Sequence, residues 1–435
     1  MAVRLVLIAI SLCVHPNPAD HPAEKSDMRQ YMQGGEYFAR GMWPPGALLP
    51  QRDRLLPMVL GGVFVFTGRS IPAAQITDMI LATSGLFALF PLARMFVSER
   101  LAVLACGLWV FDPQFVGQSC LPLSENLATP LYILAMFCLV RGRERQSPRW
   151  ALLAAVVLAI ALWARASTVL LAAGVMLWLC GWPGSAWKRA SLIALTFAFV
   201  GASWLGASVL SYRLFGFFAP NTHTYILWDN AANKLLVQTG QARDLREAHL
   251  MRLEQIRRDL GPDASLRDRL TAAKASAIDL VKKHPLLQLR NHTQAFIATA
   301  FMPDRWSMTS LLGIGSEGGT WHSTAGLKAK LRMVVVRWGW PTILYATGNF
   351  VFTMILWWWA ARSTPQWFKS RHRGVLLLLG LALITTLAAG VINIEGMPRY
   401  RLPAMPMLVL LAVAGLGRGR RHPPRGEHGG TRTTP

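Results

Sequence analysis

The sequence is poor in charge, and most of the charge that it carries is of one sign. Only 15% of its 435 residues are Asp, Glu, Lys or Arg, whereas about a quarter are charged in typical soluble domains. The 22 acidic residues are outnumbered by 45 Lys and Arg, which leaves a net charge of +23. Hydrophobic residues make up 53% and the mean hydropathy is +0.33. These values argue against a soluble protein and predict a chain that lies in a membrane.

Cysteine is also scarce, and the motifs of several enzyme classes are missing. The five cysteines lie in or beside apolar runs without Cys-x-x-Cys spacing, so neither a metal site nor a disulfide framework is predicted. We interpret them as small apolar residues of those runs. No nucleotide-binding loop is found, and no cofactor is predicted. The chemistry leaves a divalent metal open, but nothing in the sequence supports one.

About ten apolar runs divide the sequence and predict an all-α, polytopic membrane protein with about ten transmembrane helices. Several runs approach or exceed the roughly 18 to 20 residues that cross the hydrocarbon as a helix. The first run is short and lacks the cleavage site of a signal peptide, and a misassigned start would explain its length. The runs cover residues 2–14, 73–96, 101–118, 124–140, 150–163, 167–181, 190–211, 339–360, 374–392 and 403–417.

The basic residues cluster between runs, as in the segments RGRERQSPR and RSTPQWFKSRHR. Lys and Arg collect in the cytoplasmic loops of membrane proteins, so both termini are predicted to be cytoplasmic. The same distribution argues against a nucleic-acid partner. In a bacterium the chain would cross the inner membrane and present its two large loops to the periplasm.

Four parts follow from this topology. The large outer region is predicted to hold amphipathic surface helices, because Leu266, Leu270 and Ala273 repeat at helical spacing. Leu55 to Phe66 is too short to cross comfortably and is predicted to lie in the outer interface. The parts are a transmembrane module 1–211 with its first outer loop 15–72, a helical surface region 212–337, C-terminal helices 338–417 with an outer turn 393–402, and a disordered basic tail 418–435.

Polar residues gather on the predicted outer face, where charges beside hydrocarbon need partners or water. Asp27 lies in the segment SDMRQYMQGGEYFARG and is either a helix-capping acid or a catalytic one. Tyr31 is predicted on the buried side of that short helix. Glu125, in PLSEN, stands at the mouth of a span, where an acid also suits the helix dipole.

Arginines on the same face point to an anionic ligand. Arg54 precedes the interfacial helix, where snorkelling to lipid headgroups is the alternative interpretation. Two more arginines lie in NIEGMPRYRLPAMP, against the usual positive-inside bias. The planar guanidinium of Arg can bond two phosphate oxygens at once, so a phosphate site is predicted. Its candidates are Arg54, Arg165, Arg399 and Arg401, with Glu395 and Tyr400 beside the last two.

The order of these segments resembles the GT-C superfamily of membrane glycosyltransferases. The similar branch is the family-39-like group, related to protein O-mannosyltransferases and the lipid A aminoarabinose transferase. Asp27, Tyr31, Ala39 and Gly41 follow its first-loop pattern, but Met28 stands where O-mannosyltransferases have a second acid. The departure leaves a single catalytic acid and puts a protein acceptor in doubt. Later similar segments are RDRLLPMVLGGVFVFTG, PLSENLATPLYILAMFCLVRG, ALWARAST, AIDLVKKHPLLQLRNHTQAFIATAFMP and RYRLPAMPMLVLLA.

The resemblance implies transfer of a sugar from a polyprenyl-phosphate donor to a glycan, lipid or protein hydroxyl at the outer leaflet, with inversion. Asp27 would accept the hydroxyl proton, and the arginines would stabilise the departing phosphate. Membrane lipids are the other expected partners. The residues expected to orient the substrates are Glu125, Tyr31, Glu395 and Tyr400.

Three other functions stay open. A lipid or solute transporter should carry charges in mid-span, and Asp78 lies several residues into a run. A polysaccharide ligase would use a similar outer site with arginines. A non-catalytic assembly protein would have no reason to bring these polar groups together.

Overall fold

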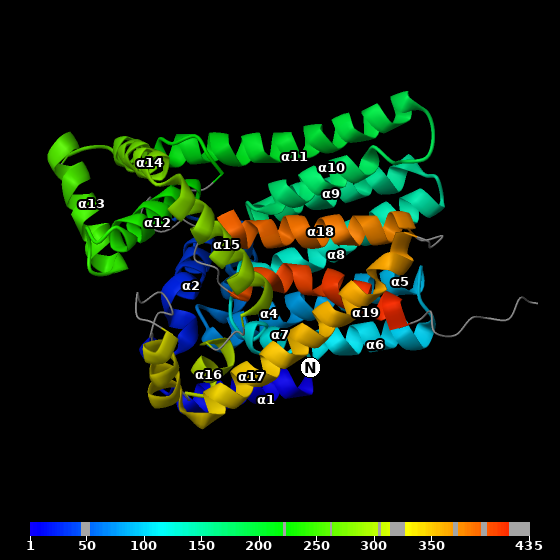
Figure 1. The fold of residues 1–435 in the computed structure, drawn as a ribbon, viewed down its shortest axis with the longest axis horizontal. Coiled ribbons are helices and arrows are strands. Elements are labelled where there is room, and N and C mark those ends of the chain that lie inside the picture. The colour runs from blue at the N-terminus through cyan, green and yellow to red at the C-terminus, as the bar shows by residue number, and fades with distance from the viewer. Residues whose placement is uncertain are drawn as a thin grey trace, which may run out of the picture.

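The computed structural model describes residues 1–44, 53–220, 223–261, 263–302, 306–313, 327–368, 373–392 and 398–416. In these ranges every regular element is a helix, which confirms the all-α fold (Figure 1). The elements of the bundle are α1 (Ala2–Val14), α3 (Leu55–Thr67), α4 (Ile71–Ser84), α5 (Leu86–Arg94), α6 (Glu99–Val110), α7 (Pro113–Gln118), α8 (Ser124–Glu144), α9 (Pro148–Ala164), α10 (Thr168–Leu179), α11 (Ala186–Phe215), α17 (Leu327–Phe368), α18 (Arg373–Ile392) and α19 (Met405–Leu416).

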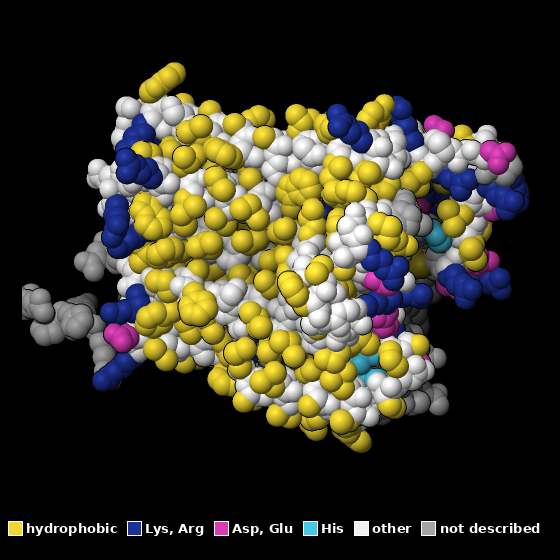
Figure 2. Space-filling model, turned by 180° about the vertical axis from the view of Figure 1, so that it is seen from behind, with side chains coloured by type: hydrophobic (Ala, Val, Ile, Leu, Met, Phe, Trp, Pro, Cys, Tyr) yellow, Lys and Arg dark blue, Asp and Glu magenta, His cyan; other side chains and the backbone are white. Residues whose placement is uncertain are grey.

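The helices of the bundle have the lengths and surfaces of a membrane protein. Three of them, Ile71–Arg94, Ala186–Phe215 and Trp340–Arg362, are long and apolar enough to span a bilayer, and six shorter apolar helices accompany them. Figure 2 shows a broad apolar surface. Along most of one edge it is bordered by Lys and Arg alone. The opposite side carries acids, arginines and histidines together. This pattern agrees with the predicted all-α membrane architecture.

The predicted span 101–118 is divided into two helices. The run 101–118 forms α6, which ends at Val110, and a separate short helix α7. Pro113 opens α7, and the carboxylate of Asp112 accepts hydrogen bonds from the backbone N–H groups of Gln114 and Phe115 at 2.8 and 3.1 Å. A residue before proline avoids helical geometry, and Asp is a strong N-cap. The Asp-Pro step therefore ends one helix and starts another.

The first loop folds back onto the bundle as helix α2 (Ser26–Ala39), which packs against α3. Two glycines allow this close contact. A Cβ at Gly35 would lie 3.0 Å from Leu60, and one at Gly61 would lie 2.6 Å from Phe38. Side chains at these positions would push α2 away from α3, so the glycines set how closely the second half of α2 approaches α3.

Between α1 and α2 the chain forms two short 3₁₀ helices, η1 (Pro18–Asp20) and η2 (Pro22–Glu24), pinned by His21. The fully buried ring of His21 accepts the backbone N–H of Ala23 at Nδ1 and is hydrogen-bonded through Nε2 to the hydroxyl of Ser11, at 3.0 and 2.9 Å. Because Nδ1 accepts, the ring is neutral with its proton on Nε2. Burial, and to a smaller extent the nearby His15, lower the pKa of His21 to about 4.

Acid is expected to destabilise this loop. The pKa of His21 is about 4 in the native protein and about 6.5 in an unfolded chain. Between these values the unfolded chain binds a proton that the native state does not, so stability falls as the pH drops from 6.5 to 4. The loss reaches about 3 kcal/mol. Unfolding measured across this interval should show the slope in the wild type and a smaller slope in His21→Gln; equal slopes would contradict the assignment.

The remaining helices gather at the end of the bundle that holds α2 (Figure 1). They are α12 (His223–Gln238), α13 (Leu245–Leu260), α14 (Leu266–Lys283), α15 (Pro285–Phe301) and α16 (Trp306–Leu311). The buried Arg252 joins three of them, because its guanidinium bonds the Asp229 carboxylate of α12 and the Ala273 carbonyl of α14. The predicted amphipathic surface helices are therefore present in this region.

Candidate active site

Asp27 and Arg399 lie in contact although 372 positions separate them in the sequence. Asp27 lies in the first turn of α2, and Arg399 belongs to the 3₁₀ helix η3 (Pro398–Ala404) before α19. The arginine Nη2 lies 2.6 Å from a carboxylate oxygen of Asp27. Their side chains are 24% and 12% exposed, so the pair is reachable from solvent at the rim of the bundle.

A second ion pair lies close to the first. Glu125 stands in the first turn of α8, and Arg165 follows the end of α9. Their side chains are 2.7 Å apart at the nearest oxygen and nitrogen, and both are nearly buried. Arg165 also donates to the Ser167 hydroxyl at 3.1 Å. The charge of Arg399 acts on Glu125 as well, so the two pairs form one electrostatic cluster.

The cluster combines two carboxylates with two guanidinium groups from four separate parts of the chain. The Asp27–Arg399 pair offers an acid that can accept a proton and a partly exposed cation that can bind an oxyanion. The Glu125–Arg165 pair, the inner pair, is more enclosed. This arrangement suits a reaction in which a proton is removed while negative charge appears nearby.

Loss of Arg165 should destabilise the protein strongly, because Glu125 would keep a buried charge without its closest partner. We expect Arg165→Gln to lower the free energy of unfolding by about 3 kcal/mol. Glu125→Gln in the same chain should restore part of that loss, since the double variant leaves no unpaired acid. Denaturation in detergent would measure both effects.

The exposed pair Arg94 and Glu99 gives the matched control. Their side chains are 45% and 67% exposed at 3.3 Å, and such surface pairs contribute about 1 kcal/mol or less. Arg94→Gln should therefore change stability little. An equal loss for Arg94→Gln and Arg165→Gln would contradict a large contribution of the Glu125–Arg165 pair to stability.

Arg401 points away from its neighbour Arg399. Residues two apart in a 3₁₀ helix differ by about 120° around its axis. Arg401 is 1% exposed, and its two terminal nitrogens donate to the carbonyls of α15 and to amide oxygens of α7 and α17. The acceptors are the carbonyls of Ala300 and Met302, both at 3.1 Å, and the side chains of Gln114 at 2.7 Å and Asn349 at 3.2 Å. This guanidinium therefore links η3 to α15, α7 and α17.

Arg54 is likewise bound to the protein. It is 3% exposed and donates to the Ala207 carbonyl at 3.0 Å and the Ser211 hydroxyl at 2.5 Å, both on α11. Its guanidinium also lies over the ring of Trp163. Burial lowers the pKa of Arg54 to about 10. Of the four predicted phosphate ligands, the structure thus brings Arg399 and Arg165 to the Asp27 cluster and places Arg54 and Arg401 in structural contacts.

Of the other predicted residues, Tyr31 is fully described by the structure, whereas Tyr400 and Glu395 are not. Tyr31 lies one turn after Asp27 in α2 and is buried in the main apolar core at 4% exposure. Tyr400 belongs to η3, but its side chain lies outside the described residues. Glu395 and the basic tail also lie outside them.

Asp78 and Gln75 hold the turn that precedes Glu125. Both are fully buried on α4. The side-chain amide of Gln75 donates to the Cys120 carbonyl at 2.9 Å, and that of Asn126 contacts the Asp78 carboxylate at 3.3 Å and the Leu121 carbonyl at 2.9 Å. Gln75 and Asp78 are polar residues spaced i, i+3 within an apolar run, and this spacing indicates that both make buried polar contacts. Nothing in the sequence indicated their partners Cys120 and Asn126, which lie 45 and 48 positions away.

The described part of the chain contains no group of three or more His, Cys, Asp or Glu side chains arranged to hold a metal ion. At the candidate site the structure brings together the two ion pairs. Arg399 is the more exposed of their two guanidinium groups, at 24% against 10% for Arg165, so it is the one that an anionic ligand would meet first.

The sequence comparison supports the predicted resemblance. Residues 55–212 match the profile of the family described as dolichyl-phosphate-mannose-protein mannosyltransferase. This confirms the resemblance to GT-C membrane glycosyltransferases over about a third of the chain. Glu125 and Arg165 fall inside the matched segment, whereas Asp27 and Arg399 fall outside it. No match is found among curated proteins.

Solved structures show a distant likeness. The archaeal oligosaccharyltransferase AglB from Archaeoglobus fulgidus, in complex with an inhibitory peptide and a dolichol-phosphate, is 14% identical with a TM-score of 0.47; the alignment covers 95% of this chain and 49% of AglB. ArnT from Cupriavidus metallidurans in the apo state is 14% identical with a TM-score of 0.39, covering 96% of this chain and 76% of ArnT. The chain thus spans about half the length of AglB.

Proposed function

We propose that this chain, whose residues 55–212 match a family named for a dolichyl-phosphate sugar donor, is a membrane glycosyltransferase. It would move a sugar from a polyprenyl-phosphate donor to a hydroxyl acceptor at the outer face of a bacterial inner membrane. The observation that carries this proposal is the 2.6 Å contact between Asp27 and Arg399. It joins a proton acceptor and an oxyanion ligand at one accessible point.

The reaction needs one bond to form and one to break. The acceptor oxygen attacks the anomeric carbon, and its proton passes to the Asp27 carboxylate. The bond between the anomeric carbon and the phosphate oxygen breaks, and the electron pair leaves with polyprenyl phosphate. Attack opposite to the leaving group inverts the carbon. A phosphate leaving group needs no proton, so a single acid is sufficient.

Arg399 would serve both the resting enzyme and the transition state. Without donor it neutralises Asp27 at 2.6 Å. A donor phosphate competes for the same guanidinium and so releases the carboxylate for the acceptor. As the glycosidic bond breaks, negative charge on the phosphate grows, and the preplaced cation stabilises the transition state more than the ground state. Donor binding would in this way prepare the base.

The inner pair would set the position of the outer one. Glu125 is held between Arg165 at 2.7 Å and the charge of Arg399. It also accepts from the neighbouring Ser124 hydroxyl at 3.3 Å. With Arg165 bound to Glu125, we assign it an indirect part in phosphate binding: it supports the acid that orients Arg399.

Transfer in a reconstituted system tests the proposal. Purified protein in liposomes, given polyprenyl-phosphate sugars and glycolipids extracted from its native membranes, should release polyprenyl phosphate as an acceptor gains one sugar. Mass spectrometry of both lipid pools measures this. Passage of intact donor across the bilayer without cleavage would support a transporter instead. Release of a polyprenyl diphosphate with transfer of a whole polysaccharide would support a ligase.

A further inference from the structure

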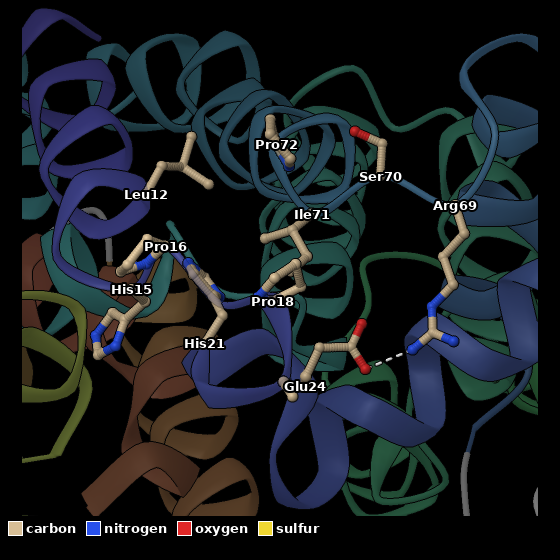
Figure 3. Close-up of a pocket in the computed structure, with 11 residues that line it drawn as sticks. Leu12, His15, Pro16, Pro18, His21, Glu24, Arg69, Ser70, Ile71 and Pro72 are labelled. Atoms are coloured by element: carbon tan, nitrogen blue, oxygen red, sulfur yellow. Dashed lines mark hydrogen bonds and ion pairs between the residues drawn. The ribbon is translucent and has the colours of Figure 1, made fainter.

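A cavity of about 560 Å³ opens at the end of α1 (Figure 3). Its volume lies within the range of small-molecule sites. Three parts of the chain form the walls: the last turn of α1, the segment between α1 and α2, and the start of α4. The lining residues are Leu12, His15, Pro16, Pro18, Ala19, His21, Glu24, Arg69, Ser70, Ile71 and Pro72.

The fixed charges of this cavity balance one another. Figure 3 shows Arg69 reaching across to Glu24, with which it forms an ion pair. The same guanidinium also contacts Glu36 of α2 at 3.2 Å, and Glu36 in turn pairs with Arg40. Two carboxylates and two guanidinium groups leave no surplus of positive charge. A phosphate would have to break these pairs, so an uncharged ligand is favoured over an anion.

The two histidines of the cavity are committed to its framework. Nε2 of His15 is hydrogen-bonded to the backbone carbonyl of Ser310 at 2.8 Å and must be the donor, because a carbonyl only accepts. Both ring nitrogens of His21 are occupied by Ala23 and Ser11. These contacts fix the segment between α1 and α2 in place.

The lining combines rigid apolar walls with the polar side chains of Glu24 and Arg69. Pro16, Pro18 and Pro72 hold their backbone angles, which lowers the entropy lost when a ligand binds. Arg69 donates hydrogen bonds, and Glu24 accepts them. A sugar has an apolar face of C–H groups and an edge of hydroxyls. The apolar face would pack against the proline walls, and the hydroxyls would form hydrogen bonds with Arg69 and Glu24. No charge would be added to the cavity.

One wall of the cavity is continuous with the segment that carries the proposed base. Glu24 on its wall precedes Asp27 by three residues, a stretch that spans at most about 11 Å. We propose that this cavity binds the uncharged sugar end of the acceptor, so that one of its hydroxyls reaches Asp27. The assignment rests on the proposed function. It adds a second binding site, separate from that of the donor phosphate.

Photo-crosslinking in lipid nanodiscs tests the assignment without relying on activity. The full protein is exposed to a diazirine-bearing alkyl glucoside, and the labelled peptides are mapped by mass spectrometry. A diazirine-bearing alkyl phosphate with the same chain is the comparison probe. We expect the glucoside to label segments 12–24 and 69–72 more strongly than the phosphate does.

Filling the cavity gives the specific control. Ala19→Trp and, from the opposite wall, Pro72→Trp should each reduce glucoside labelling about tenfold, equivalent to about 1.4 kcal/mol of binding, whereas Ala19→Ser should not. Binding of polyprenyl phosphate should stay unchanged in all three. Labelling that survives both Trp variants, labelling that favours the phosphate, or no labelling of these segments would each overturn the acceptor site. The proposed sugar transfer fails only if the reconstituted wild type shows no transfer.

Discussion

Asp27→Asn is expected to reduce sugar transfer by about 10²- to 10⁴-fold, the usual contribution of a general base. The amide keeps the size of the carboxylate but cannot accept the proton of the acceptor hydroxyl. Asp27 is mostly buried and its loss removes a carboxylate partner of the partly exposed Arg399, so we also expect a loss of about 1–3 kcal/mol of stability. Initial rates with saturating donor, measured at equal protein levels in membranes, check the result.

Asp20→Asn is the matched control for this variant. Asp20 is an exposed acid in the same outer segment, where it accepts from the side chain of Asn17 at 2.9 Å. The same change of chemistry there should leave the rate unaltered. Full activity of Asp27→Asn would remove the base from the mechanism, and equal losses in both variants would point to the loop as a whole.

Arg399→Gln is expected to weaken donor binding by about 10- to 100-fold, because a hydrogen bond to a charged group contributes about 1.5–3 kcal/mol. Its rate at saturating donor should fall further, since the cation acts on charge that grows in the transition state. Binding of a polyprenyl phosphate and the rate at saturation measure the two effects separately. Unchanged affinity and unchanged rate would leave the phosphate without this ligand.

Arg401→Gln should behave differently although the two residues lie on the same 3₁₀ helix. Its guanidinium is buried and has four protein acceptors. Removing it strands those groups, so we expect a loss of about 3 kcal/mol in the free energy of unfolding. Thermal unfolding in detergent should separate the variants: the loss for Arg401→Gln should exceed that for Arg399→Gln, because the Arg399 side chain is partly exposed.

The sequence predicted the helical membrane class because apolar runs and clustered basic residues report directly on lipid and topology. It also singled out Asp27 and Arg399, since charges on an otherwise apolar chain stand out. The division of the run 101–118 could have been recognised from the Asp112-Pro113 step. Hydropathy alone does not register such a step, because the residues on either side are apolar.

The roles of individual arginines were beyond prediction from sequence. Arg399 and Arg401 share one motif, RYR, and only the direction of each side chain separates an accessible cation from a buried one. Arg54 looked like an interfacial cation, yet α11, more than 140 positions later in the chain, supplies its partners. Contacts between distant segments depend on how the helices pack, and that information is spread over the whole core.

The short helix η3 has a consequence for turnover. Arg401 bonds η3 to α15, α7 and α17, and these bonds resist an outward movement of η3. In the proposed mechanism the product phosphate would then be displaced from Arg399 without such a movement. Asp27, once it had passed its proton to water, would be the nearest anion to pair again with that guanidinium. The same carboxylate would then both start a catalytic cycle and reset the enzyme for the next one.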